Sequence, residues 1–178
     1  DSTYVQAAAG LFHTVLLRSD GNVVAFGDPN NGRCEIPQLE PDVTYVQVAA
    51  GGSHTVLCRS DRTAVAVGCN EDGQCTVPVL PSHLWYVQVS AGQNHTALLR
   101  NDGRVAMYGA NGFGQCDVPE LHGETYYVQV SCGALHSVFL LSDGCAVAVG
   151  YNGDGQCNIP QLEDGLTFTQ ISAGGHHS

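Results

Sequence analysis

A seven-residue pattern that ends in glycine returns along this chain at one fixed interval, and this period limits the fold more than any other feature. A typical copy is Tyr45-Val-Gln-Val-Ala-Ala-Gly51. Five copies begin 41 residues apart, at Tyr4, Tyr45, Tyr86, Tyr127 and Phe168. A strict period of this length is typical of a solenoid, a propeller or another array of like units. The 178 residues therefore divide into repeats at 4–44, 45–85, 86–126 and 127–167, with the start of a fifth at 168–178.

Each repeat contains three short strand patterns. In the second repeat they are Tyr45 to Ala50, His54 to Arg59 and Thr63 to Val67, with turns rich in Gly or Asp between them. The other full repeats join the second and third patterns through Asp-Gly, where glycine accepts a positive φ, but the second repeat has Arg62 there. A fourth, shorter extended piece is expected through the Cys-x-Ile/Val-Pro segment, because its proline suits the edge or exit of a strand.

Three or four antiparallel strands in each unit, without the 3.6-residue apolar period of a helix, are typical of one blade of a β-propeller. A β-solenoid is the structural alternative. The residues of each unit follow the pattern Val-x-x-Gly-x-x-His-Thr/Ser-x-x-Leu-x-x-Asp-Gly-x-Val-x-x-x-Gly-x-Asn-x-x-Gly-Gln. This pattern resembles the repeat of the regulator of chromosome condensation family. The compact length and the Gly-Gln-Cys-Thr-Val-Pro ending look most like the short repeats of one seven-bladed member, β-lactamase inhibitor protein II.

The resemblance implies an all-β fold, a β-propeller of the regulator of chromosome condensation type, with about four blades of a seven-bladed ring in this chain. The fifth copy of the pattern stops at Ser178, so we expect a fragment of a longer repeat protein or a protomer that a partner completes. The remaining blades would come from the same longer chain or from a second chain. The first is favoured, because an open propeller leaves two strand edges exposed.

The charge balance limits the classes of partner. The chain has 6 Lys and Arg residues, all of them Arg, against 17 Asp and Glu, which gives a formal net charge of -11. Nucleic acid is therefore not expected as a partner, because phosphate backbones are bound by clustered cations. The acidity fits a solvated surface or attraction to a basic protein. No apolar run approaches the roughly 20 residues that cross a bilayer, and no signal or transit segment opens the chain.

Several polar residues recur in every unit and are interpreted as architecture. The repeated histidines are not expected to share a metal ion, because zinc needs ligands at about 2 Å and successive blades hold equivalent atoms well apart. We expect their ring nitrogens, and the repeated Gln side chains, to bond to neighbouring backbone. No cofactor is expected. The repeated histidines are His13, His54, His95, His136 and His177.

The eight cysteines fall into two classes. Four recur at one position of the repeat, namely Cys34, Cys75, Cys116 and Cys157, whereas Cys58, Cys69, Cys132 and Cys145 occur singly. No spacing typical of zinc sites is present. Small buried thiols are the favoured interpretation, which fits an intracellular reducing compartment such as the cytoplasm. Cys132 with Cys145 and Cys69 with Cys75 remain the pairs to examine for a disulfide.

Function is sought where the repeats differ, because architecture must recur in every blade. Two loops vary, one after each repeated glycine and one after each third strand pattern. Aromatic residues in such loops form the partner surface of β-lactamase inhibitor protein II, and the resemblance implies that role here. The alternative is that these residues pack on adjacent blades, and Trp85 in a variable linker is assigned to either core or interface. The candidate partner-binding residues are Leu11, Phe12, Asn94, Phe113, Leu135 and Tyr151.

Catalysis would need a cluster of acid, base or nucleophile outside the repeat, and only Glu71, Asp72, Asp154 and His176 offer one. No nucleophile elbow, phosphate loop or metal motif accompanies them, so no catalytic residue is assigned. The sequence favours a non-catalytic scaffold for protein–protein interaction, either free or as a subunit of a larger complex. The alternatives are a carbohydrate-binding propeller and the partner-binding module of a ubiquitin ligase.

Overall fold

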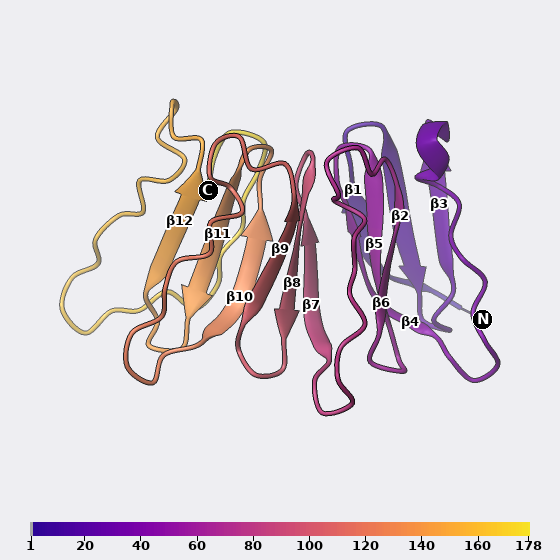
Figure 1. Ribbon diagram of the computed structural model, residues 1–178, viewed down its shortest axis with the longest axis horizontal. Helices are drawn as coiled ribbons and strands as arrows, with labels where there is room; N and C mark the ends of the chain where they lie inside the picture. The colour runs from indigo at the N-terminus through magenta and orange to yellow at the C-terminus, as the bar shows by residue number, and fades with distance from the viewer. Residues whose placement is uncertain (1) are drawn as a thin grey trace.

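Four three-stranded antiparallel sheets follow one another in chain order in the computed structural model, which describes residues 2–178 (Figure 1). We call each sheet a blade. The strands are β1 (Tyr4–Ala9), β2 (His13–Arg18) and β3 (Val23–Gly27) in blade 1, β4 (Tyr45–Ala50), β5 (His54–Arg59) and β6 (Ala64–Gly68) in blade 2, β7 (Tyr86–Ala91), β8 (His95–Arg100) and β9 (Val105–Gly109) in blade 3, and β10 (Tyr127–Cys132), β11 (His136–Leu141) and β12 (Ala146–Gly150) in blade 4. One turn of 3-10 helix, η1 (Asn30–Gly32), follows β3.

The strand predictions for the second repeat are confirmed, and β6 differs only by starting and ending one residue later than expected. The expected fourth strand is wrong. In the second repeat Gly73 and Thr76 donate their N–H groups to carbonyls three residues earlier, and the N–H of Cys75 goes to Oδ1 of Asn70 at 2.8 Å. Tight turns therefore use the donors that a fourth ladder would need, and Pro78 has none to offer.

The hydrophobic core lies between the blades. One cluster joins Val15 and Leu17 of blade 1 to Tyr45, Val48 and Leu57 of blade 2, and two similar clusters fill the next two junctions. A blade between two others is thus covered on both faces, which is why the middle strand β5 is buried from His54 to Cys58. The middle strand of blade 1, β2, alternates between buried and half-buried residues, because only one of its faces is covered.

A repeated tyrosine ties each blade to the end of the preceding unit. The hydroxyl of Tyr45 donates to the carbonyl of Pro37 at 2.8 Å, and Tyr86 donates to Pro78 at 2.9 Å. The proline that ends the Cys-x-Ile/Val-Pro segment of one repeat therefore accepts a hydrogen bond from the tyrosine that begins the next repeat. In the described part of the chain, no helix has the length and apolar character needed to cross a membrane.

Candidate functional site

The two variable loops of each blade lie at the same end of the sheet. In blade 1, His13 at the start of β2 pairs with Gly27 at the end of β3, so the turn before β2 lies next to the loop after β3. A backbone hydrogen bond joins the two loops in every blade: Asp28 to Phe12, Cys69 to Ser53, Ala110 to Asn94 and Tyr151 to Leu135, at 2.8 to 2.9 Å. We call the edge formed by residues 11–12, 28–33, 52–53, 69–73, 93–94, 110–114, 134–135 and 151–155 the loop face.

All six candidate partner-binding residues lie on this loop face, although their binding role stays a prediction. Phe113 of blade 3 and Tyr151 of blade 4 pack edge to face, with ring centroids 5.3 Å apart at 72°, and Phe113 remains 53% exposed. Leu11 and Phe12 are also exposed, and the Arg33 guanidinium lies 5.5 Å from the Phe12 ring centroid. Asn94 and Leu135 are half-buried. Phe113 fits both the predicted partner-binding role and the alternative, packing on an adjacent blade, because it contacts Tyr151 of the next blade and still faces solvent.

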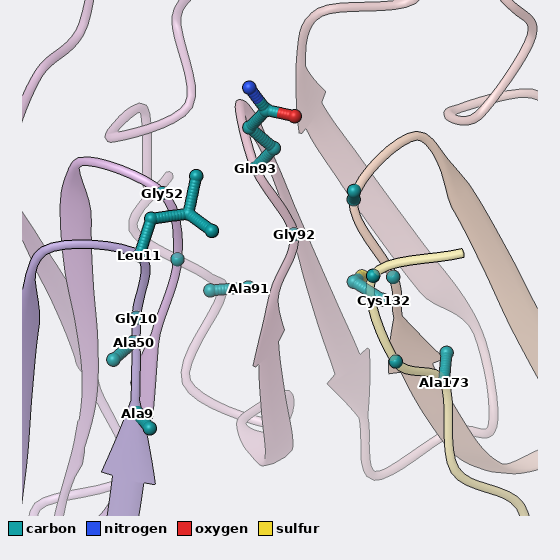
Figure 2. A pocket seen from close by; sticks show the side chains of 15 residues that line it. Ala9, Gly10, Leu11, Ala50, Gly52, Ala91, Gly92, Gln93, Cys132 and Ala173 are labelled. Atoms are coloured by element: carbon teal, nitrogen blue, oxygen red, sulfur yellow. The ribbon is translucent and has the colours of Figure 1, made fainter. Parts of the chain in front are cut away.

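A hollow of about 200 Å³ lies where the first strands of the blades converge beside the loop face (Figure 2). Its walls are equivalent residues of all five units, among them Leu11, Gly52, Gln93, Ala134 and Gly175. Backbone bonds link neighbouring units there, as from the N–H of Gln93 to the carbonyl of Ala134 at 3.2 Å. The lining contains no ionisable side chain other than Cys132, so the hollow offers shape rather than acid–base chemistry.

The repeated histidines hold the blades together, but through a different contact from the one expected. Nε2 of His54 lies 2.8 Å from Oγ1 of Thr96 in the next blade, and Thr96 donates its hydroxyl hydrogen to the carbonyl of Gln74 at 2.7 Å. The hydroxyl must then accept from Nε2–H, which both the neutral and the protonated ring carry. Burial, with a smaller contribution from His95 and then His13, lowers the pKa of His54 to about 4. The expected bond to the backbone is therefore wrong, because the ring bonds to a hydroxyl.

The repeated glutamines also bond across the junctions rather than locally. Gln88 donates from Nε2 to the carbonyl of Val130 at 3.1 Å, and its Oε1 accepts the N–H of Val130 at 2.9 Å. One amide side chain thus satisfies both backbone groups of a residue in the next blade, as a paired strand would. Gln6 and Gln129 form the same two bonds with Val48 and Ile171. These contacts tie the first strand of each blade to that of the next.

The repeated cysteines are part of the turns. Sγ of Cys75 donates to the carbonyl of Cys69 at 3.2 Å, and Sγ of Cys116 donates to Ala110 at 3.3 Å. Burial raises the pKa of the Cys75 thiol and of the Cys116 thiol to about 11. All eight cysteines in the described part of the chain are free, so neither Cys69 with Cys75 nor Cys132 with Cys145 is joined.

We expect Cys75 to react slowly with iodoacetamide in the folded protein. A pKa of about 11 in place of the usual 9.0 leaves roughly a hundredfold less thiolate near neutral pH. Peptide mass spectrometry at timed intervals, with urea-unfolded protein as the reference, measures the rate at each cysteine. Labelling of Cys75 at the same rate in folded and unfolded protein would contradict the structural role of this thiol.

The four side chains considered for catalysis do not assemble into a buried cluster. His176 and Asp154 approach to 3.7 Å, but both are more than half exposed, and Glu71 and Asp72 lie on the exposed loop of blade 2. Among residues 2–178, no group of three or more His, Cys, Asp or Glu residues is placed to hold a metal ion.

The repeats match a family model described as the regulator of chromosome condensation (RCC1) repeat, at residues 4–33, 45–74, 86–115 and 127–156. No curated protein matches the chain.

Solved structures of propellers resemble the chain closely in backbone and weakly in sequence. The structure of Kap60 bound to yeast RCC1 (Prp20) matches with a TM-score of 0.79 at 20% identity, over 98% of this chain and 53% of that one. Prp20p from Saccharomyces cerevisiae, described with its binding to Gsp1p and histones, gives 0.74 at 23% identity over 90% and 46%. Human WBSCR16 gives 0.75 at 20% identity over 88% and 51%. The chain spans about half the length of these proteins. Together they show the fold, a β-propeller of which this chain contributes about four blades of a larger ring.

Proposed function

Because the chain belongs to the regulator of chromosome condensation (RCC1) repeat family, we propose that it is a non-catalytic scaffold that binds a protein partner through its loop face. Yeast Prp20 supports this class of function, since it has been crystallised with Kap60 and studied for binding to Gsp1p and histones. The observation that carries the proposal is Phe113, which is 53% exposed while it packs on the half-buried Tyr151, in loops that backbone hydrogen bonds join. Aromatic anchors on fixed loops supply most of the energy in typical interfaces.

The charge of the loop face favours a basic partner. Asp28, Glu71, Asp72 and Asp154 lie along it, whereas its one arginine, Arg33, is buried and pairs with Asp28 at 3.5 Å. An acidic surface accelerates association with basic proteins and repels nucleic acid. A protein with a basic patch around an apolar pocket is therefore the partner that fits this face.

We expect the double variant Phe12→Ala with Phe113→Ala to weaken partner binding about 30-fold or more, because each truncated anchor costs on the order of 1–2 kcal/mol. The partner is first recovered by pull-down with the intact ring, and affinities are then measured by calorimetry. Tyr126→Ala is the control, because Tyr126 is 51% exposed but lies at the opposite end of the blades. Unchanged affinity in the double variant would exclude the loop face as the binding surface.

The carbohydrate alternative loses part of its support. Sugar hydroxyls are bound by available amides and carboxylates, but two of the loop asparagines, Asn111 and Asn152, are already engaged. Asn111 accepts the N–H of Cys116 at 2.8 Å and donates to Asp117 at 2.8 Å, and Asn152 does the same with Cys157 and Asn158.

The outer face of blade 1 supports the proposal that further blades complete a ring. Tyr4 is 61% exposed, while its equivalents Tyr45, Tyr86 and Tyr127 are at most 6% exposed because a preceding blade covers them. A preceding blade, from the same longer chain or from a second chain, would cover Tyr4 in the same way. Amide hydrogens of β1 should then exchange as slowly as those of β4 in the intact protein, and fast exchange at β1 alone would argue for an open fragment.

A further inference from the structure

Blade 2 departs from the repeat at three positions that lie around one groove, on the face opposite the loop face. This opposite face carries the turns between the second and third strands, and we call it the turn face. Arg62 stands where the other blades have Gly21, Gly103 and Gly144. Val79 stands where they have Gln38, Glu120 and Gln161. Trp85, the only tryptophan, stands where they have Thr44, Tyr126 and Thr167.

The backbone at Arg62 is held in a conformation that disfavours arginine. Its φ is +74°, and the glycines at the equivalent positions have φ values of +77°, +74° and +82°. The other non-glycine residues with positive φ in residues 2–178 are Asn31 and Asp42, whose side chains tolerate it better. A strained residue that departs from its own repeat is a candidate for a role other than folding.

Arg62 has no partner that explains its charge. Its guanidinium lies over the Trp85 ring, 4.7 Å from the centroid, and forms no ion pair or hydrogen bond with other residues of the described chain. The neighbouring Asp61 carboxylate is used locally, because it accepts from the N–H of Thr63 at 2.9 Å and from its hydroxyl at 2.6 Å. The backbone N–H of Trp85 donates to Oδ1 of Asn101 at 2.9 Å, which anchors the chain where the tryptophan begins its stack on Arg62. The stack therefore presents fixed cationic donors to solvent.

An apolar groove of about 200 Å³ adjoins this stack. Val77, Pro78 and Leu80 form part of its wall, Arg62 stands at its edge, and Val79 beside it is 94% exposed. Blades 3 and 4 have corresponding grooves of about 390 and 530 Å³, so the groove belongs to the architecture. Among these three grooves, only that of blade 2 combines an unpaired guanidinium, an exposed valine and an adjoining tryptophan.

We propose that this groove binds a linear segment of a partner protein in which an aliphatic side chain is flanked by carboxylates. The aliphatic side chain would enter the groove beside Val79, and a carboxylate would accept hydrogen bonds from Arg62 while the guanidinium stays on Trp85. The site lies on the turn face, so it is independent of the proposed loop-face partner and both can be occupied at once.

The net charge of the chain helps to distinguish specific from non-specific peptide binding. The chain carries a net charge of -11, so non-specific attraction would favour a basic peptide over an acidic one. The probes are three fluorescein-labelled pentapeptides: Glu-Asp-Leu-Asp-Glu, Glu-Asp-Ala-Asp-Glu and Lys-Lys-Leu-Lys-Lys. Fluorescence polarisation with the intact protein should show tightest binding of the first, by about tenfold over each of the others. Equal or weaker binding of the first peptide, or none up to about 1 mM, overturns the proposal.

Arg62→Gly is the decisive variant because it restores the residue of the other blades and should fold at least as well as the wild type. It should weaken the first peptide at least fivefold while the melting temperature stays the same or rises. The matched control is Arg104→Asn, which removes the cation that lines the groove of blade 3 and takes the residue found at Asn22 in blade 1. If Arg62→Gly lowers the melting temperature and leaves peptide binding unchanged, Arg62 acts only in folding and the proposed site is wrong.

Discussion

Lowering the pH from 7 to 5 is expected to destabilise the protein by about 4 kcal/mol through two buried histidines, His54 and His95. Burial lowers the pKa of each to about 4, from an unperturbed 6.5. Between pH 6.5 and pH 4 the unfolded chain therefore binds protons that the folded chain refuses, so stability falls as the pH falls and levels off below pH 4. Each histidine contributes about 2 kcal/mol of this loss between pH 7 and pH 5.

The charged groups around the histidines act in the same direction. After burial itself, His95 and then His13 lower the pKa of His54, His136 lowers that of His95, and Arg33 lowers that of His13. Protonation of one ring would place a positive charge beside a second histidine, and among residues 2–178 no carboxylate is one of the groups that shift the pKa of His54 or His95. Asp20, Asp28, Asp61 and Asp102 have pKa values lowered from 3.8, so their contribution is lost only at still lower pH.

Urea unfolding at pH 7, 6 and 5 measures the effect as a falling midpoint at constant slope. His95→Gln should reduce the loss between pH 7 and pH 5 by about 2 kcal/mol, because one ring with a lowered pKa is removed while an amide can still donate to Ser137. His122→Gln, at an exposed linker position, is the control and should leave the curve unchanged. Equal stability at pH 7 and pH 5 would show that the repeated histidines are not buried in their neutral form.

Gly92→Ala is expected to destabilise the protein by about 3 kcal/mol or more. A Cβ at this position would lie 2.5 Å from the carbonyl oxygen of Gly133 in the next blade and would also meet the ring of His95. The Gly133 backbone and the His95 ring are both held by contacts between blades, so they cannot both move to make room for this Cβ. The reason is space and not conformation, because Gly92 is not among the glycines with positive φ.

Thermal unfolding checks this prediction, with a loss of about 6–12 °C expected for a domain of this size. Gly112→Ala is the matched control, because a Cβ there would meet nothing within 4 Å, and we expect a change within about 0.5 kcal/mol. A melting temperature for Gly92→Ala equal to that of the control would mean that the blades are not packed as closely as the structure shows.

Part of the candidate site could be predicted from the sequence, because a repeat compares a chain with itself. Positions such as Phe12, Phe113 and Tyr151 vary where the architecture does not, and this variation alone placed them in the same two loops. The contact between Phe113 and Tyr151 could not be predicted, since the two residues belong to different blades and their separation depends on how the sheets pack. The stack of Arg62 on Trp85 was missed for the same reason, although both residues stood out as departures from the repeat.

The sequence by itself determined the 41-residue unit, the bounds of its strands to within one residue and the glycine turns between them. These features depend on residues close together in the chain, whose alternation and backbone preferences can be read directly. The tertiary structure decided where the repeated polar groups bond: Gln88 and His54 reach residues 42 positions away. It also decided burial, since Tyr4 and Tyr45 begin the same motif but only Tyr45 is covered by a preceding blade. Contacts between blades depend on which surface lies opposite, and no local pattern contains that information.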